Sequence, residues 1–205
     1  MNISHNVSVQ IEKVVRNAGA TALTFFNKPD LEQKFKSKRD LVTEADEKTE
    51  ASLIEELSKI EPSGFLSEEF NPDTDIGTKP LWIIDPIDGT TNFASGIAPF
   101  AISVAHYDGS TVDAAFCYLP VTDELFTAYL GRGAFLNGKK IAVNNDSDPM
   151  LCVAATGFAD ITHDQPENTV AVFASVIKKV RTIRRLGSAV TDLVYTAAGK
   201  FAFFY

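Results

Sequence analysis

The sequence predicts an α+β fold made of two parts, and three observations support this. Two long segments with apolar residues at helical spacing open the chain, and short apolar segments typical of strands follow from Gly64. After about residue 146, predicted strands alternate with predicted helices, as in an α/β unit. We therefore expect residues 1–145 to form an N-terminal α+β domain and residues 146–205 to form part of a C-terminal α/β domain.

The two helices at the start of the chain are predicted from their periodicity. Between Val7 and Phe26, apolar side chains recur every three or four residues. The same spacing predicts a second helix over Glu44–Ile60, and Thr43 is expected to be its N-cap, because a threonine oxygen can accept from a free backbone N–H group. The segment QKFKSKRDLVT between the helices is predicted to be a short strand and a loop.

The middle of the chain is predicted to be a series of strands. GFLSEE and PLWIID are apolar runs that end in acidic residues, and the second is predicted to be a buried strand. Two hairpins are expected over residues 100–120 and 123–143. Their turns contain Asp108-Gly and Asn137-Gly, which tolerate the positive φ angles of tight turns.

The last part of the chain is predicted to alternate between strands and helices. The predicted elements are a strand over 151–156, a helix over 168–179, a strand over 180–186, and a helix over 188–198 that ends at Gly199. The chain then closes on the apolar segment KFAFFY. We expect this segment to pair with a strand outside the sequence, and hence a C-terminally truncated chain.

Composition argues against several classes of protein. The net charge is -8, whereas nucleic-acid binding requires a basic surface, and the basic cluster Lys178–Arg185 is interpreted as a solvated helix end. Cys117 and Cys152 lack the spacing of a metal site or disulfide framework, so both are predicted to be buried free thiols. Because no membrane-length apolar run or secretory signal is visible, the predicted location is cytoplasmic.

The segment WIIDPIDGTTNF places two carboxylates at the end of a predicted buried strand. Asp85 and Asp88 are three residues apart, so in a straight strand they would point to opposite faces. Pro86 offers no donor to a neighbouring strand and predicts a bend that brings both carboxylates and the Ile87 carbonyl together. Magnesium prefers hard oxygen ligands of this kind.

The residues after this bend are predicted to form the open N-terminus of a helix. Gly89, Thr90 and Thr91 would leave backbone N–H groups free to bind a phosphate. A plainer interpretation is that Asp88-Gly89 forms a turn and that Asp85 caps the strand. We favour the functional interpretation because all these residues meet at one strand end, where open sheets bind ligands.

Two further acidic segments can contribute to the same site. If GFLSEE lies beside PLWIID, either Glu68 or Glu69 would reach the two aspartates, and the other glutamate would be a solvated loop charge. Carboxylates this close repel one another unless a cation is bound. In DLVTEAD, Asp40 ends the early loop and Asp46 lies in the first turn of the second helix. A plainer interpretation of Asp46 is that its negative charge only stabilises the positive end of the helix dipole.

Together these segments resemble the inositol monophosphatase family. WIIDPIDGTTNF is similar to the first signature of that family, and four more segments occur in its order and spacing: DLVTEAD, LSEE, GRGAFLNGKKI and RRLGSAVTDLVYTAAG. The resemblance covers essentially the whole chain and is greatest to bacterial enzymes of the extragenic-suppressor (SuhB) type. It implies a layered αβαβα sandwich of the sugar-phosphatase type, here with an incomplete C-terminal α/β unit.

The resemblance also implies a role for individual residues. Magnesium would be held by Glu68, Asp85, the Ile87 carbonyl and Asp88. Glu68 and Thr90 would orient the attacking water, and Asp46 would support Thr90. The substrate would contact Asp88, Gly89, Thr90, Gly187, Ser188 and Ala189. Surface or turn roles are predicted for His5, His106 and His163, because this chemistry needs no histidine.

The activity implied by the resemblance is hydrolysis of a small phosphate monoester, inositol monophosphate, by metal-activated water. The resemblance also implies two or more Mg2+ ions, lithium sensitivity and a homodimer. The substrate would be a phosphorylated polyol, and neither a membrane nor a nucleic acid is expected as a partner. Alternatives are fructose 1,6-bisphosphate, histidinol phosphate, NADP or adenosine bisphosphate as substrate, or a non-catalytic role beside the transcription machinery. The family's second signature, a Trp-Asp pair that supplies another metal ligand, is expected beyond Tyr205.

Overall fold

The structure is a computed structural model that describes residues 3–28, 33–35, 41–158 and 166–205. It divides into two compact units, Met1–Lys140 and Ile141–Tyr205, and each is described by itself. Both units combine helices and strands, which confirms the predicted α+β class.

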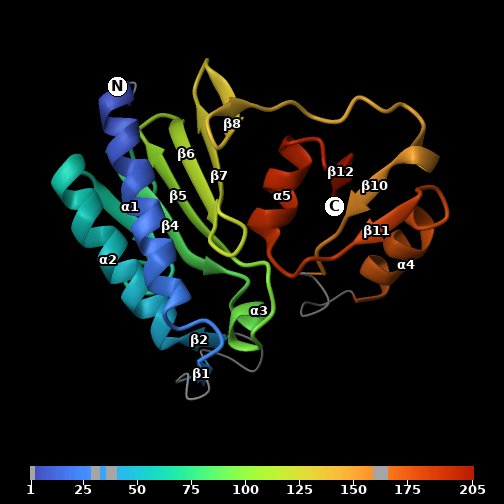
Figure 1. The fold of residues 1–205 in the computed structure, drawn as a ribbon, viewed down its shortest axis with the longest axis horizontal. Coiled ribbons are helices and arrows are strands. Elements are labelled where there is room, and N and C mark those ends of the chain that lie inside the picture. The colour runs from blue at the N-terminus through green and yellow to red at the C-terminus, as the bar shows by residue number, and fades with distance from the viewer. Residues whose placement is uncertain (1–2, 29–32, 36–40, 159–165) are drawn as a thin grey trace. The chain divides into compact units, whose positions relative to one another are not determined.

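A seven-stranded sheet forms the centre of the first unit. Its strands, in the order in which they pair, are β3 (Gly64–Ser67), β4 (Leu81–Asp88), β5 (Ala101–Tyr107), β6 (Val112–Leu119), β7 (Glu124–Tyr129), β8 (Gly133–Leu136) and β9 (Lys139–Lys140). Neighbouring strands are antiparallel except for β3 and β4, which are parallel. The helices α1 (His5–Leu23) and α2 (Glu44–Ile60) cover one face of this sheet (Figure 1).

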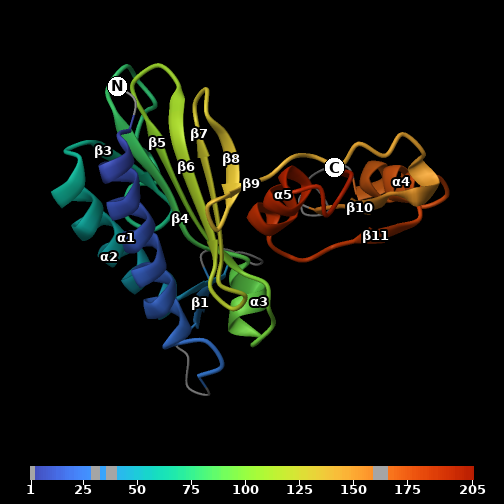
Figure 2. The same ribbon diagram turned by 45° about the horizontal axis from the view of Figure 1, so that its top comes forward.

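Helix α1 is shifted toward the N-terminus relative to its prediction. It begins at His5 rather than Val7, because the side chain of Ser4 accepts a hydrogen bond from the Val7 N–H and caps the helix start. It ends at Leu23, and the chain then turns over residues 24–27, where Phe26 had been predicted to be helical. Figure 2 shows α1 and α2 lying side by side on the sheet.

Helix α2 has the predicted bounds and the predicted cap. Oγ1 of Thr43 accepts from the Ala45 N–H at 3.2 Å, and Oδ2 of Asp46 accepts from the Thr43 N–H at 2.9 Å. This capping box satisfies backbone donors that would otherwise be unpaired at the helix start. The helix follows directly from a two-stranded antiparallel pair, β1 (Gln33–Phe35) and β2 (Leu41–Thr43).

The hydrophobic core of the first unit lies between the two helices and the sheet. Every second side chain of β4, β5 and β6 points toward the helices, as expected for a sheet covered on that face. The buried side chains of this core include Ile11, Val15, Leu53, Leu57, Trp82, Ile84, Ile102 and Phe116. Burial of each such side chain stabilises the fold by about 1.5–3 kcal/mol, so α2 is a rigid support for the residues it carries.

Both predicted hairpin turns are confirmed. Gly109, which follows Asp108, has a φ of 98°, and Asn137 and Gly138 have φ values of 45° and 76°. These left-handed conformations are the ones that Asp-Gly and Asn-Gly pairs tolerate. The chain therefore reverses at the expected residues, between β5 and β6 and between β8 and β9.

The surface or turn role predicted for His106 is wrong. This residue lies within β5, only 4% of it is exposed, and its Nδ1 atom lies 2.7 Å from Oδ1 of the buried Asp113. The β5–β6 ladder has a register shift after His106. His106 pairs with Ala114 and Tyr107 pairs with Val112, so Asp113 is an extra residue in β6, and it is placed inward beside His106. His163 lies outside the described residues.

The second unit contains a three-stranded parallel sheet with the order β11-β10-β12. Its strands are β10 (Val153–Ala155), β11 (Thr182–Arg184) and β12 (Phe203–Phe204), and its helices are α4 (Pro166–Val176) and α5 (Ala189–Ala197). Four of these elements were predicted with bounds. The strands β10 and β11 and the helix α5 are shorter than expected, and α4 begins and ends earlier than the predicted 168–179. Before β10, Asp148 accepts from the Met150 N–H and starts a 3-10 helix over Pro149–Leu151. Leu151, the first residue of the predicted strand, therefore belongs to this 3-10 helix.

One part of the prediction for the apolar segment at the end of the sequence is also wrong, namely that its partner strand lies outside this sequence. Phe203 and Phe204 pair in parallel with Ala154 and Ala155 of β10, so the partner strand lies within this chain. The Thr156 hydroxyl also donates to the Tyr205 carbonyl, 49 residues away. A parallel partner so distant in the chain produces no local pattern in the sequence.

Other sequence predictions concern cysteines, charges and membranes. Cys117 and Cys152 are both free thiols, with Cys152 buried and Cys117 half-buried. The charged side chains of Lys178–Arg185 are exposed, as expected for a solvated cluster. Within the described part of the chain, no helix is both long and apolar enough to span a membrane.

Candidate active site

The candidate site begins at an irregularity near the end of β4. Asp85 pairs with Ser103 of β5, but the next pair joins Asp88 to Ala101, so Pro86 and Ile87 together face a single residue. This is a β-bulge at the position of the proline, and a bulge reorients the side chains on either side of it. The predicted bend between the two aspartates is therefore confirmed.

The bulge is stabilised by the first aspartate itself. Oδ1 of Asp85 accepts a hydrogen bond from the Ile87 N–H at 3.1 Å, across the bend. The Ile87 side chain, 1% exposed, is anchored in a second apolar cluster with Phe93 and Phe100. With its side chain buried and its N–H bonded, Ile87 has a fixed backbone, and this fixes the direction of its carbonyl group.

The chain after the bulge turns directly into the short helix α3 (Thr90–Ala94). Gly89 precedes this helix with a φ of 96° and a ψ of 38°, a left-handed conformation that residues with a Cβ rarely adopt. The predicted helix start at Gly-Thr-Thr is thus present, although the helix has only 5 residues.

Asp46 links α2 to the start of α3. Its Oδ1 atom lies 3.3 Å from the Thr90 hydroxyl, and that hydroxyl also lies 3.0 Å from the Ile87 carbonyl. Its Oδ2 atom is held by the backbone and side chain of Thr43, at 2.9 and 2.6 Å. Burial raises the pKa of Asp46, although the hydrogen bonds from Thr43 oppose that shift. Asp40, from the same segment of the sequence, lies outside the described residues.

Glu68 reaches the same region from the neighbouring strand. It follows β3 directly, and β3 pairs in parallel with β4 so that Ser67 is aligned with Ile84. The next residue of β4 is Asp85, which brings the two acids to the same end of adjacent strands. The charge of Glu68 contributes to raising the pKa of both Asp85 and Asp46. The structure therefore brings together the acids that the sequence placed in one cluster.

Crowding of these acids has a clear electrostatic consequence. Burial, together with the charges of Asp88 and Glu68, raises the pKa of Asp85 to about 8. Burial also raises the pKa of the nearby Cys117 thiol to about 11, with smaller contributions from Asp88 and Asp85, so it is no thiolate nucleophile at neutral pH. An excess of negative charge in a buried position is relieved either by protonation or by a bound cation.

The donor set fits a hard divalent cation. Two carboxylates of one bulge, a carboxylate from the adjacent strand and the Ile87 carbonyl are all oxygen ligands, the type that magnesium prefers. Among the residues that the structure describes, no three His, Cys, Asp or Glu side chains are close enough together to hold an ion as they stand. The metal site is supported by the oxygen chemistry of this donor set and by the effect of its charges on the pKa of Asp85, not by a preformed ligand cage.

Glu50 belongs to this region but was not predicted from the sequence. It lies on α2, is 0% exposed, and accepts hydrogen bonds from the Glu69 and Phe70 N–H groups, both at 2.8 Å. The available signal is its position four residues after Asp46 and three before Leu53, which places a glutamate within the buried stripe of the helix. A charged residue at such a position indicates a specific partner.

The predicted substrate residues Gly187, Ser188 and Ala189 belong to the second unit. Gly187 has a φ of 82°, Ser188 is the buried N-cap of α5 and accepts from the Thr191 N–H at 3.2 Å, and Ala189 is the first residue of that helix. The predicted helix start at this point is confirmed. Their local conformation is that of a glycine turn followed by a capped helix.

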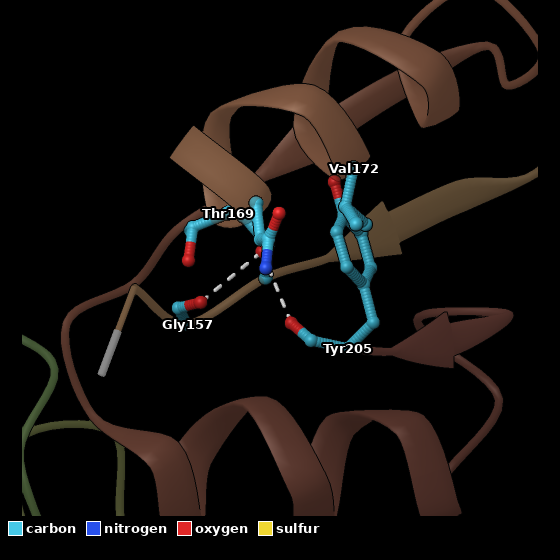
Figure 3. A pocket seen from close by; sticks show the side chains of 6 residues that line it. Gly157, Thr169, Val172 and Tyr205 are labelled. Carbon is cyan, nitrogen blue, oxygen red and sulfur yellow. Dashed lines mark hydrogen bonds between the residues drawn. The ribbon is translucent and has the colours of Figure 1, made fainter. Parts of the chain in front are cut away.

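A separate pocket of about 230 Å3 also lies in the second unit (Figure 3). Its lining residues come from the end of β10, from α4 and from the end of β12: Thr156, Gly157, Asn168, Thr169, Val172 and Tyr205. The Thr156 hydroxyl bonds the Tyr205 carbonyl at 3.0 Å and fixes one wall. None of the residues predicted to bind metal or substrate lines this pocket.

The chain is similar to known proteins over nearly its whole length. A model of the inositol monophosphatase family matches residues 4–205. The chain is 37% identical over 200 residues to an inositol-1-monophosphatase of Rhizobium meliloti, covering 97% of this chain and 75% of that protein. It is 37% identical over 175 residues to the Nus factor SuhB of Pseudomonas aeruginosa, covering 83% and 65%.

Solved structures show the same similarity at the level of the fold. The crystal structure of the extragenic suppressor protein SuhB from Bartonella henselae superposes with a TM-score of 0.85 at 36% identity, covering 96% of this chain and 75% of that one. Nearly the entire chain therefore matches, both in sequence and in structure. With the family model covering residues 4–205, the chain belongs to the inositol monophosphatase family.

Proposed function

We propose that the protein hydrolyses a small phosphate monoester, most specifically inositol monophosphate, to an alcohol and inorganic phosphate in a magnesium-dependent reaction. The observation that carries this proposal is the meeting of Asp85, Asp88 and Glu68 at the ends of two adjacent parallel strands, beside Thr90. Membership of a phosphatase family supports the reaction class.

In this proposal, magnesium is held by the carboxylates of Glu68, Asp85 and Asp88 and by the Ile87 carbonyl. When bound, such ions lower the pKa of water and stabilise charge on phosphate oxygens. The side chains contribute by neutralising the ions and by excluding other ligands. The raised pKa of Asp85 is consistent with this role, because a carboxylate that resists ionisation alone becomes stable as an anion beside a cation.

Thr90 and Glu68 are proposed to orient the attacking water. The Thr90 hydroxyl has acceptors on two sides, the Ile87 carbonyl at 3.0 Å and Asp46 at 3.3 Å, but only one proton to donate. Its oxygen therefore keeps a lone pair available to accept a hydrogen bond from water. Glu68 accepts a second hydrogen bond, so the water oxygen is directed rather than free to rotate.

The remaining site residues are proposed to bind the substrate. The backbone N–H groups of Gly89 and Thr90, at the left-handed turn before α3, would bind the phosphate together with Asp88. Gly187, Ser188 and Ala189 would contact the alcohol side. We also propose lithium sensitivity, a homodimeric assembly and a cytoplasmic location.

Replacement of one ligand tests the proposal. Asp88→Asn should lower magnesium-dependent phosphate release from inositol monophosphate by at least about 100-fold, because even outer partners of metal ligands are worth roughly 10- to 100-fold. Asp73→Asn, which changes an exposed loop aspartate, is the matched control and should retain activity. Circular dichroism checks that both variants are folded. Retained turnover in Asp88→Asn would remove Asp88 from the mechanism.

A second candidate function is a regulatory role beside the transcription machinery. One relative carries the name Nus factor SuhB, and the exposed basic cluster Lys178–Arg185 offers a charged surface on an otherwise acidic chain. Absence of hydrolysis across a panel of phosphate esters, together with co-purification with RNA polymerase, would favour this function. The same panel distinguishes inositol monophosphate from fructose 1,6-bisphosphate, histidinol phosphate, NADP and adenosine bisphosphate.

A further inference from the structure

The carboxylate of Glu50 is bound by two consecutive backbone groups of a distant turn. Its Oε2 atom accepts from the Glu69 N–H and its Oε1 atom from the Phe70 N–H, both at 2.8 Å. The side chain is completely buried within α2, 19 and 20 residues before its partners. A buried carboxylate is stable only when its charge is compensated in this way, so the contact is specific.

The turn that receives these bonds carries Glu68. At its base, the Ser67 N–H donates to the Asn71 carbonyl at 3.3 Å, and the Asn71 amide donates to the Ser67 hydroxyl at 3.1 Å. Ser67 is also fixed by the pairing of β3 with β4, where it lies opposite Ile84. Glu68 therefore stands between two fixed residues, Ser67 on the sheet side and Glu69 on the helix side.

We propose that Glu50 is a positioning residue for the reaction: by holding the Glu69 and Phe70 N–H groups, it sets the backbone from which Glu68 reaches the metal and the water. This inference rests on the proposed function. It adds to that function a residue that neither contacts the substrate nor binds the metal, and that acts only through the turn over residues 68–70.

The position of Glu50 on α2 explains why one helix can organise the site. Asp46 and Glu50 are four residues apart and lie on the same buried side of the helix. Asp46 contacts Thr90, and Glu50 holds the turn of Glu68, so each residue proposed to orient water is supported by a carboxylate of α2. Both distances are set together because the helix packs as one rigid body on the sheet.

The chemistry of the contact specifies a carboxylate. Two backbone donors require two acceptors, which glutamate supplies and glutamine does not, since one of its terminal atoms is an NH2 donor. Glu50→Gln keeps the size and shape of the side chain but turns a donor toward a donor. One buried N–H then loses its partner, and the turn must open or shift to satisfy it.

The first measurement is made on the full chain without any substrate. Amide hydrogen exchange followed by NMR should show protected Glu69 and Phe70 amides in the wild type and faster exchange of both in Glu50→Gln. Calorimetric titration with magnesium chloride should then show affinity weakened by about 10- to 100-fold, the range found for outer partners of metal ligands. Steady-state kinetics should show a lower kcat with little change in the KM for inositol monophosphate.

Two variants separate positioning from general loss of stability. Glu55→Gln changes an exposed glutamate on the same helix and should leave all three readouts unchanged. Leu57→Ala removes a fully buried core side chain of α2 and should lower the melting temperature without altering magnesium affinity. Equal weakening of magnesium affinity in Leu57→Ala would show that the effect of Glu50→Gln is one of stability, and would overturn the proposal.

The outcomes also distinguish this inference from the proposed function. Faster exchange of the two amides with unchanged magnesium affinity would assign Glu50 a purely structural role and overturn the inference, whatever the activity. Wild-type protein that binds magnesium but hydrolyses no phosphate ester would overturn the proposed function alone, because the affinity of Glu50→Gln would still decide the role of Glu50. Wild-type protein that binds no magnesium would overturn both.

Discussion

The Thr90 hydroxyl lies 3.3 Å from Oδ1 of Asp46, a residue 44 positions earlier in the chain. This contact joins the first turn of α2 to the first residue of α3, and it sits beside the bulge that carries both aspartates. Asp46 is 1% exposed and is already bound by Thr43 through its other oxygen, so it has little freedom to move. The orientation of Thr90 therefore depends on a cap that belongs to a different helix.

The first prediction concerns the Thr90 hydroxyl. Thr90→Val keeps the shape of the side chain but removes the hydroxyl, and should lower kcat for phosphate release by roughly 100-fold, within the range for loss of a positioned proton-transfer group. Thr90→Ser retains the hydroxyl and should stay within a few-fold of wild type. Combining Thr90→Val with Asp46→Asn should cost little beyond the single variants, because contacting residues act as a unit. Full additivity would show that Asp46 acts elsewhere.

The second prediction concerns the pH dependence of stability in the absence of metal. Asp85 has its pKa raised from the ordinary 3.8 to about 8 by burial and by the charges of Asp88 and Glu68. Between these values the folded protein binds more protons than the unfolded chain, so the free energy of unfolding should fall as pH rises through that window. Asp85→Asn should abolish most of this slope and be more stable than wild type at pH 8 by more than about 1 kcal/mol, the equivalent of one pKa unit.

Urea unfolding in EDTA from pH 5 to pH 8 measures this slope directly. Added magnesium should stabilise the wild type more than Asp85→Asn and so narrow the difference at pH 8, since a ligand at 100 times its Kd stabilises the protein that binds it by about 2.7 kcal/mol. A wild-type protein whose stability is independent of pH over this range would contradict the assigned shift at Asp85.

The third prediction concerns the buried pair of His106 and Asp113. Nδ1 of His106 lies 2.7 Å from Oδ1 of Asp113, and the histidine ring packs against Trp82 with 4.7 Å between ring centres. His106→Ala should lower the free energy of unfolding by about 2–4 kcal/mol, because it leaves a cavity and a buried carboxyl group without its partner. Asp113→Asn retains an acceptor and should cost less. Urea unfolding of both variants checks this; equal and negligible losses would contradict it.

The fourth prediction concerns the left-handed turn at Gly89. With a φ of 96°, this position accepts a Cβ only with strain, so Gly89→Ala should cost about 1–2 kcal/mol and displace the N–H groups proposed to bind phosphate. Phosphate release should fall together with stability. Gly77→Ala is the matched control, because a Cβ there meets nothing within 4 Å. Thermal unfolding and activity assays of the two variants should differ clearly, and similar behaviour would contradict the prediction.

Local features of the site could be predicted from the sequence because their causes are local. Thr43 and Asp46 close a capping box within four residues, and Pro86 produces a bulge between residues that are adjacent to it. The positive φ angles at Gly109 and Asn137 follow from single residues. Each of these features depends on backbone sterics or on hydrogen bonds that span a few positions.

Features that depend on distant partners could not be predicted in this way. The bonds from Glu50 to Glu69 and Phe70 span 19 and 20 residues, and a glutamate on a helix resembles a solvated charge until its partners are known. His106 precedes a turn and was expected at the surface, but strand register carries Asp113 inward beside it. The apolar end of the chain was expected to pair with a strand outside the sequence, whereas β10 supplies a partner within it.

By itself, the sequence determined the α+β class, the bounds of α2, the bulge after Asp85 and the acids that gather there, since all of these follow from periodicity, capping and proline geometry. Only the tertiary structure decided that β3 lies parallel to β4, that Glu68 therefore ends beside Asp85, and that Glu50 holds its turn. Strand pairing and burial bring together residues that are far apart in the chain. Contacts between such residues stabilise the fold but produce no periodic or local pattern in the sequence.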